Sequence, residues 1–146
     1  MRDRASSIGE VTASTGESTR TNTALLSSLA GLTALGVLLQ GLWAGLFVPV
    51  GDGGNYDDTW VGVHAAGAWA TLLLAAATTV VAFLRHRTRR ELWTGALVLT
   101  ALLVVEIGLG TAISDGKSGA AAAIHIPLAL LIMSLTVWLP LRARRG

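Results

Sequence analysis

The feature that most constrains this sequence is a set of four long apolar stretches. They cover residues 24–48, 60–84, 92–113 and 120–141, and together they contain one carboxylate, Glu106, and no Lys or Arg. A helix needs about 20 mostly apolar residues to cross a hydrocarbon core of about 30 Å, whereas a transmembrane strand needs only about 9–11 residues of alternating character. The pattern therefore predicts an all-α integral membrane protein whose four helices contact the lipid bilayer.

Composition supports this fold class and excludes several others. Only 14% of the 146 residues are charged, compared with about 25% in an average soluble domain. The chain has no cysteine, which excludes a disulfide scaffold. In a membrane protein the basic residues report on topology, so their small excess over acidic residues does not predict a nucleic-acid partner.

The basic residues predict the topology. Ten of the 11 are arginines in the N-terminal segment, the loop at 85–90 and the C-terminal tail, whereas Lys117 stands alone on the opposite side. The positive-inside rule then predicts a multi-pass protein of the plasma (cytoplasmic) membrane with both termini in the cytoplasm. The polar residues 1–23 are expected to form a disordered cytoplasmic tail, and residues 142–146 a short basic one. Short loops between the spans (24–141) predict an antiparallel four-helix bundle.

Two histidines fall at matching depth in this bundle. His64 comes four residues after the start of the second stretch, and His125 five residues after the start of the fourth. Because these helices run in the same direction, both imidazoles are expected about 6–8 Å below the outer boundary. Gly67, Ala68 and Ala129 follow on the same helix faces and are expected to leave room for a flat ligand beside the rings.

The ligand chemistry favours haem for this pair. A lone zinc ion usually needs a third or fourth protein ligand, and cysteine is absent. Haem iron needs only two axial ligands, so His64 and His125 form a sufficient set, with a b-type haem as the expected cofactor. Two alternatives stay open: both histidines are interfacial residues whose polar tips reach headgroups or carbonyls, or they serve another metal or a proton. His86 is interpreted as part of the solvated arginine loop.

Two further charged residues are candidates for the same site. Glu106 is expected about 10 Å deep, near the haem plane, where it is either a catalytic or hydrogen-bonding partner of the cofactor or a protonated carboxyl that bonds a neighbouring helix. Lys117 is the only basic residue of the outer side. It either neutralises a haem propionate or is an ordinary loop lysine.

The two halves of the apolar region read as copies of one helical hairpin. Residues 39–45 (LQGLWAG) lead through a loop to His64, and residues 105–111 (VEIGLGT) lead through a loop to His125. In these motifs the chain resembles one four-helix half of the haem A synthase family, over roughly residues 30–141. The resemblance implies a haem held by histidines of the second and fourth helices near the outer side.

The chain departs from that family where catalysis is concerned. Val61 and Ala65 stand where the family typically has a glutamate and an arginine around the first histidine, and the family's cysteine pair is absent. The expected function is therefore a cytochrome b-like, haem A synthase-like protein in electron transfer, haem handling or oxidase assembly, with a respiratory-chain assembly partner. One alternative is a half-length haem-modifying oxygenase that acts as a homodimer, and another is a haem-free accessory membrane subunit.

Overall fold

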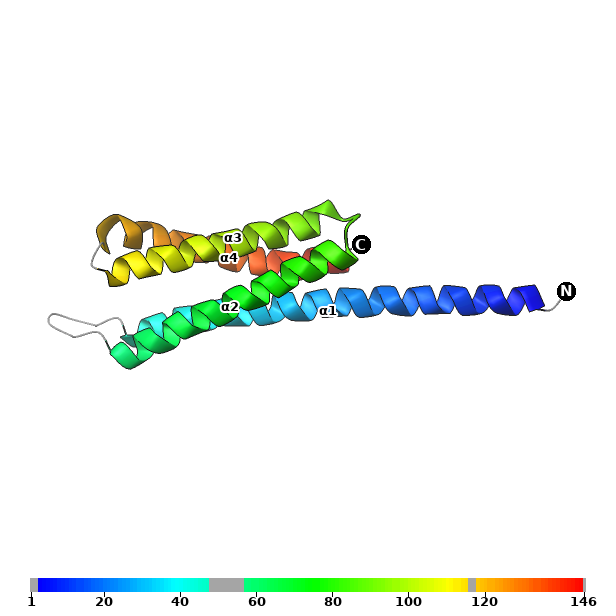
Figure 1. Ribbon diagram of the computed structural model, residues 1–146, viewed down its shortest axis with the longest axis horizontal. Coiled ribbons are helices and arrows are strands. Elements are labelled where there is room, and N and C mark those ends of the chain that lie inside the picture. Colours follow the sequence, from blue (N-terminus) through cyan, green and yellow to red (C-terminus); the bar gives the residue numbers. More distant parts are fainter. Residues whose placement is uncertain (1–2, 48–56, 116–117, 146) are drawn as a thin grey trace.

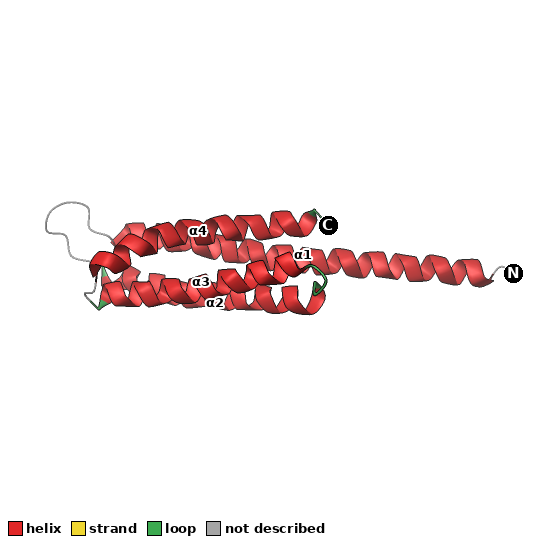
Figure 2. Ribbon diagram, turned by 90° about the horizontal axis from the view of Figure 1, so that it is seen from above, coloured by secondary structure: helices red, strands yellow, loops and turns green. Residues whose placement is uncertain are grey.

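The computed structural model is helical throughout the part that it describes (Figure 1), namely residues 3–47, 57–115 and 118–145, with side chains described from Thr21 onward except for Asn22 and Ser118. The helices are α1 (Asp3–Phe47), α2 (Asp58–Arg85), α3 (Arg90–Ser114) and α4 (Ser118–Arg144). Successive helices run in opposite directions, as short connections require (Figure 2). The prediction of an all-α four-helix bundle is confirmed.

The helices form a closed ring of neighbours. α1 packs on α2 and α4, and α3 packs on the same two helices, whereas the described parts of α2 and α4 do not touch. α2 and α4 are therefore diagonally opposite across the bundle. This arrangement places the second helix of each hairpin at an equivalent corner.

All four helices are long and apolar enough to cross a membrane. Between 11% and 22% of the most apolar part of each helix is buried inside the bundle, so most of its apolar side chains face outward. Leu73, Ile126 and Leu130 are each about two-thirds or more exposed. Lipid is the solvent that such a surface suits, because hydrocarbon tails are as apolar as the leucine side chains.

The structure differs from expectation at both ends of the chain. Residues 1–23 were expected to be disordered, but α1 is helical from Asp3 and projects beyond the bundle (Figure 1). Extending an existing helix avoids the cost of nucleating a new one, so the apolar part of α1 can propagate into the polar segment. At the other end, α4 continues through Arg144, into the tail expected at 142–146.

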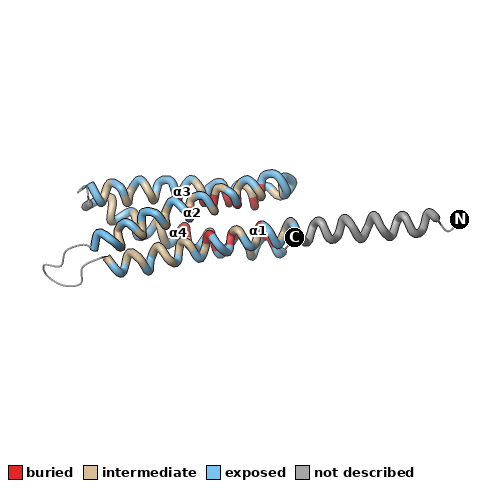
Figure 3. Tube along the Cα trace, turned by 60° about the horizontal axis from the view of Figure 1, so that its bottom comes forward, coloured by how far each residue is buried: buried red, intermediate tan, exposed pale blue. Residues whose placement is uncertain are grey.

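The tightly packed core occupies only one half of the bundle (Figure 3). Its buried side chains lie toward the α2–α3 loop and the C-terminus, and they are mostly small or aliphatic. These residues are Leu26, Ala30 and Thr33 of α1, Thr71, Ala75, Thr78 and Ala82 of α2, Leu92, Ala96, Leu99 and Leu103 of α3, and Ile132, Thr136, Leu139 and Ala143 of α4. Among the described residues of the other half, which holds His64 and His125, none is fully buried. The two hairpins come apart toward that end in Figure 1.

Small and hydroxylic residues make the close contacts between helices. A Cβ atom on Gly36 would lie 2.5 Å from Oγ1 of Thr71, so this glycine allows α1 and α2 to approach. The Thr79 and Thr100 hydroxyls hydrogen-bond between α2 and α3 at 2.9 Å. Gly41 and Gly45, whose spacing is typical of helix contacts, instead face outward with no neighbour within 4 Å of their Cβ positions.

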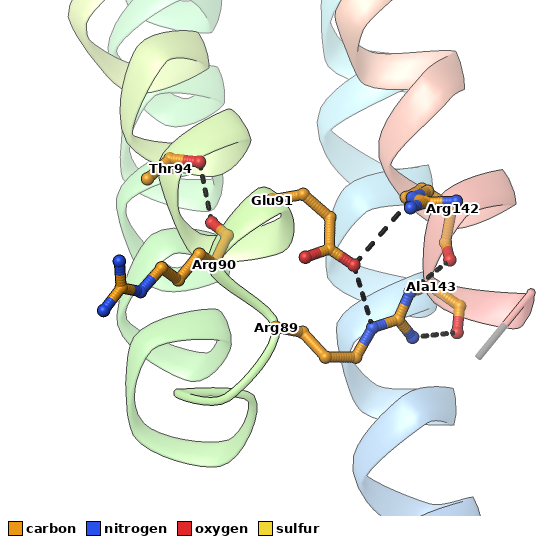
Figure 4. A network of polar contacts seen from close by, with 6 residues as sticks. All are labelled: Arg89, Arg90, Glu91, Thr94, Arg142 and Ala143. Atoms are coloured by element: carbon orange, nitrogen blue, oxygen red, sulfur yellow. Dashed lines mark hydrogen bonds and ion pairs between the residues drawn. The ribbon is translucent and has the colours of Figure 1, made fainter.

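Side chains cap the helix ends that position the hairpins. Asp57 accepts hydrogen bonds from the backbone N–H groups of Thr59 and Trp60 and so begins α2. Arg89, in the loop between α2 and α3, donates to the carbonyl oxygens of Arg142 and Ala143 at 2.8 and 3.1 Å (Figure 4). This cation satisfies the last carbonyls of α4, where the helix dipole is negative, and fixes the loop to that helix.

Candidate functional site

His64 is held by the preceding helix of its own hairpin. Its Nδ1 lies 3.1 Å from the carbonyl oxygen of Gln40 in α1. In the tautomer that carries its proton on Nδ1, the ring donates to this carbonyl oxygen and Nε2 keeps its lone pair. That is the arrangement by which proteins orient a metal-ligating histidine, through a hydrogen bond from the other ring nitrogen.

The Gln40 side chain joins the same two helices. With its amide nitrogen turned toward His64, it donates to the His64 carbonyl oxygen at 2.9 Å, and the same nitrogen lies 3.1 Å from Nδ1 of His64. The amide oxygen accepts from the backbone N–H of Ala68 at 3.2 Å. Ala68, expected to border a ligand, is thus half-buried beside the Gln40 amide. Gln40 therefore fixes the register of α1 against the turn of α2 that carries His64.

The space beside Gly67 is already filled by protein. A Cβ atom at this position would overlap the ring of Trp43 and lie 2.5 Å from Nε2 of Gln40. The missing side chain therefore admits Trp43 and Gln40, where the sequence was expected to leave room for a ligand. On another side of His64, the ring of Phe47 meets the imidazole edge to face, with ring centroids 5.3 Å apart.

His125 has the corresponding partner in the second hairpin. Its Nδ1 lies 3.3 Å from Oε1 of Glu106 in α3. Both side chains are largely sheltered, with 23% of His125 and 13% of Glu106 exposed. Nδ1 of His125 and Oε2 of Glu106 are nevertheless buried without a hydrogen-bond partner among the described residues. An unpaired buried polar atom costs free energy, so this end of the site has hydrogen-bonding capacity that the described contacts do not use.

The backbone around His125 is less regular than that around His64. Pro127 lies inside α4 and has no N–H group to donate to the carbonyl oxygen four residues earlier. Across the helix pair, Gly110 faces the ring, and a Cβ atom there would lie 3.7 Å from Cε1 of His125. Ala129, one turn beyond, is half-buried, and no described contact assigns it to a ligand site.

The two hairpins thus repeat one local arrangement. A polar residue of the first helix, Gln40 or Glu106, lies against Nδ1 of a histidine in the second helix. The histidines stand on the diagonal helices α2 and α4. Nδ1 of each ring faces the preceding helix of its own hairpin.

Other candidates lie elsewhere. Lys117 falls outside the described residues. His86 ends α2 at the opposite end of the bundle and belongs to the arginine loop. Within the described ranges, no group of three or more His, Cys, Asp or Glu side chains is placed to hold a metal ion.

Sequence reasoning missed the aromatic part of the site. Trp43 and Phe47 follow Gln40 at spacings of three and seven residues, which place all three on one face of α1. This periodicity could have predicted that the three side chains share one face. It could not show which helix the face packs on, because every neighbouring helix is equally apolar.

No protein-family model, curated protein or solved structure matches this chain. The resemblance to the haem A synthase family therefore rests on the short motifs around residues 39–45 and 105–111 and stays a prediction.

Proposed function

We propose that this chain is a multi-pass membrane protein that binds one b-type haem between α2 and α4, with His64 and His125 as axial ligands. The proposed orientation puts the arginine-rich end in the cytoplasm and the histidines beneath the outer face of the plasma membrane. A haem site at that face would carry out electron transfer or haem handling. Haem, when bound, would supply the redox chemistry.

The observation that carries this proposal is that Nδ1 of each histidine lies against the preceding helix of its own hairpin. The Gln40 carbonyl oxygen lies 3.1 Å from Nδ1 of His64, and Oε1 of Glu106 lies 3.3 Å from Nδ1 of His125, so Nε2 is the ring atom that we assign to the iron. Two further features support a ligand between the hairpins. The half of the bundle that holds the histidines has no fully buried residue among those described, and Oε2 of Glu106 is buried there without a partner.

The residues around His64 and His125 are suited to binding haem and less suited to modifying it chemically. Two neutral imidazoles on diagonal helices are a complete axial set. Val61 and Ala65, beside His64, offer no acid, base or cation for a reaction at the macrocycle edge. We therefore propose that the site binds haem and transfers electrons. The experiment below distinguishes this role from haem modification and from a haem-free accessory role.

The test is an absorption spectrum of the full chain, purified in detergent from haem-replete cells and reduced with dithionite. We expect the sharp α and β bands of a low-spin, six-coordinate haem. His64→Ala and His125→Ala should each remove these bands and lower the haem content, whereas His86→Ala, in the arginine loop, should change neither. Helical circular dichroism checks that all three variants fold.

Three other results would contradict the proposal or change the assigned function. A colourless wild-type protein would overturn haem binding and leave the accessory subunit. Unchanged haem content in both His64→Ala and His125→Ala would overturn the ligand assignment. A hydroxylated or formylated haem in the acid–acetone extract would show that the protein modifies its cofactor.

A further inference from the structure

The opposite end of the bundle carries an arrangement that the proposed function does not use. Arg87, in the loop after α2, holds its guanidinium 4.7 Å from the centre of the Phe83 ring. Phe83 in turn meets Trp93 of α3 edge to face, with ring centroids 5.8 Å apart. The stack fixes a cation at the seam between α2 and α3, on a ring that is itself 43% exposed.

The arginines at this end fall into two sets. Glu91 is the only carboxylate among the side chains described there, and it pairs with Arg89 at 3.2 Å and Arg142 at 3.8 Å. Arg89 is also committed to the carbonyl oxygens at the end of α4. These contacts lie between α3 and α4, where one carboxylate is shared by two guanidinium groups and compensates part of their positive charge (Figure 4).

The second set has no such compensation. Arg90 points away from this network, to the other side of α3, as Figure 4 shows. No acidic partner of Arg90 or Arg87 occurs among the described side chains. The Arg87 guanidinium thus lies at the α2–α3 seam, and Arg90 begins α3 three residues later along the same loop, with neither guanidinium paired to an acidic side chain among those described.

An apolar surface lies directly next to these cations along the same helices. Phe83 and Leu84 occupy the last turn of α2, and Leu97 lies two turns beyond Arg90 on α3, all of them exposed. A ligand that suits both parts has an anionic head and a hydrocarbon tail. Exposed cations above an apolar helix surface are the arrangement that recognises an anionic lipid.

We propose that Arg87 and Arg90 form a binding site for the phosphate of an anionic phospholipid, with its acyl chains on the exposed apolar surface of α2 and α3. Guanidinium groups bind phosphate oxygens through paired hydrogen bonds, which a lysine ammonium reproduces less well. The stacked ring holds Arg87 at the seam, so less side-chain entropy is lost on binding. The proposal is independent of haem.

The test uses the full chain in nanodiscs of phosphatidylcholine, with phosphatidylglycerol added in steps and the retained lipids counted by native mass spectrometry. We expect phosphatidylglycerol to be retained over phosphatidylcholine. The double variant Arg87→Ala/Arg90→Ala should weaken that retention about 25-fold, since each basic residue at a membrane surface contributes about fivefold. Arg144→Ala/Arg145→Ala removes the same charge from the C-terminal end and should leave retention within about threefold.

Each alternative result overturns the proposal. Equal losses in the two double variants would show diffuse attraction by net charge, and no loss in either would show that the lipid does not bind here. Displacement by inorganic phosphate would show a site for a free ion. If the alanine variant fails to fold, Arg87→Lys/Arg90→Lys keeps the charge and should still lose retention severalfold. Full retention by this lysine variant would also contradict the site.

Discussion

Nδ1 of His125 lies 3.3 Å from Oε1 of Glu106, and this contact joins α3 to α4 in the loosely packed half of the bundle. Its counterpart in the first hairpin is a backbone carbonyl, that of Gln40. The two proposed axial ligands therefore have acceptors of different strength. A carboxyl oxygen beside a ligating histidine raises the basicity of the ring more than a neutral carbonyl does when the carboxyl is ionised.

The Glu106 contact gives the first prediction. Glu106→Leu removes the acceptor and should lower haem affinity about tenfold to a hundredfold, the usual range for losing the outer partner of a metal-ligating histidine. Glu106→Gln keeps an acceptor, so it should retain haem but shift the midpoint potential upward. Haem titration measures the affinity, and a redox titration followed by absorbance measures the potential. Wild-type values in both variants would contradict a role for Glu106 at the haem.

The control for Glu106 is Thr111, five residues further along α3. Thr111 of α3 is exposed, and its hydroxyl bonds only the Ile107 carbonyl oxygen of its own helix. Thr111→Val changes a polar residue of the same helix without touching His125. We expect haem affinity and potential to stay at the wild-type values in this variant, so a general effect of altering α3 is separable from the loss of the carboxyl.

Much of this arrangement is predictable from the sequence, for identifiable reasons. α2 and α3 begin and end within a few residues of the apolar stretches 60–84 and 92–113, because the hydrocarbon thickness fixes the length of a span. The equivalent positions of Gln40 and Glu106, and of the two histidines, follow from the repeat of the helical hairpin. The span lengths and the hairpin repeat both depend on the spacing of residues along the chain, which can be read from a single sequence.

Other features depend on how the helices are rotated about their axes. Nearly every position of α1–α4 within the spans is apolar, so hydropathy does not reveal which face meets a neighbour. The contact of Trp43 with Gly67 and the capping of α4 by Arg89 both join distant parts of the sequence. The same uniformity hides the confinement of the core to one half, since leucines of both halves look alike in the sequence.

Gly67 gives the second prediction. Gly67→Ala would place a Cβ atom in the ring of Trp43 and against the Gln40 amide, so α1 and α2 must move apart around His64. We expect a loss of about 1–3 kcal/mol in the free energy of unfolding, as for other overpacked sites. Gly62→Ala, on the same helix, meets nothing within 4 Å and should be neutral or stabilising by up to about 1 kcal/mol through helix propensity. Unfolding in mixed micelles compares the two, and equal stabilities would contradict the close contact.

Arg89 gives the third prediction. Arg89→Ala leaves the carbonyl oxygens of Arg142 and Ala143 without their side-chain donor and removes the ion pair with Glu91. Because this group is partly exposed, with 24% of its side chain accessible, we expect a loss of only about 1–2 kcal/mol. The neighbouring Arg90→Ala should change the stability by less than about 0.5 kcal/mol. Thermal unfolding measures both, and a similar effect of the two substitutions would show that loop charge alone matters.

Leu99 and Leu97 give the fourth prediction, which tests where the bundle is held together. Leu99 is fully buried at the centre of the packed half, whereas Leu97, two residues earlier on α3, is 50% exposed. Leu99→Ala leaves a cavity and should cost about 2–5 kcal/mol, while Leu97→Ala exchanges one lipid-facing side chain for another and should cost less than about 1 kcal/mol. Unfolding in mixed micelles measures the difference. If the packed half holds the helices, Leu99→Ala should lower stability without moving the haem spectrum, because no described contact joins Leu99 to His64 or His125. A spectral change equal to that of His125→Ala would instead mean that the two halves of the bundle are not separable.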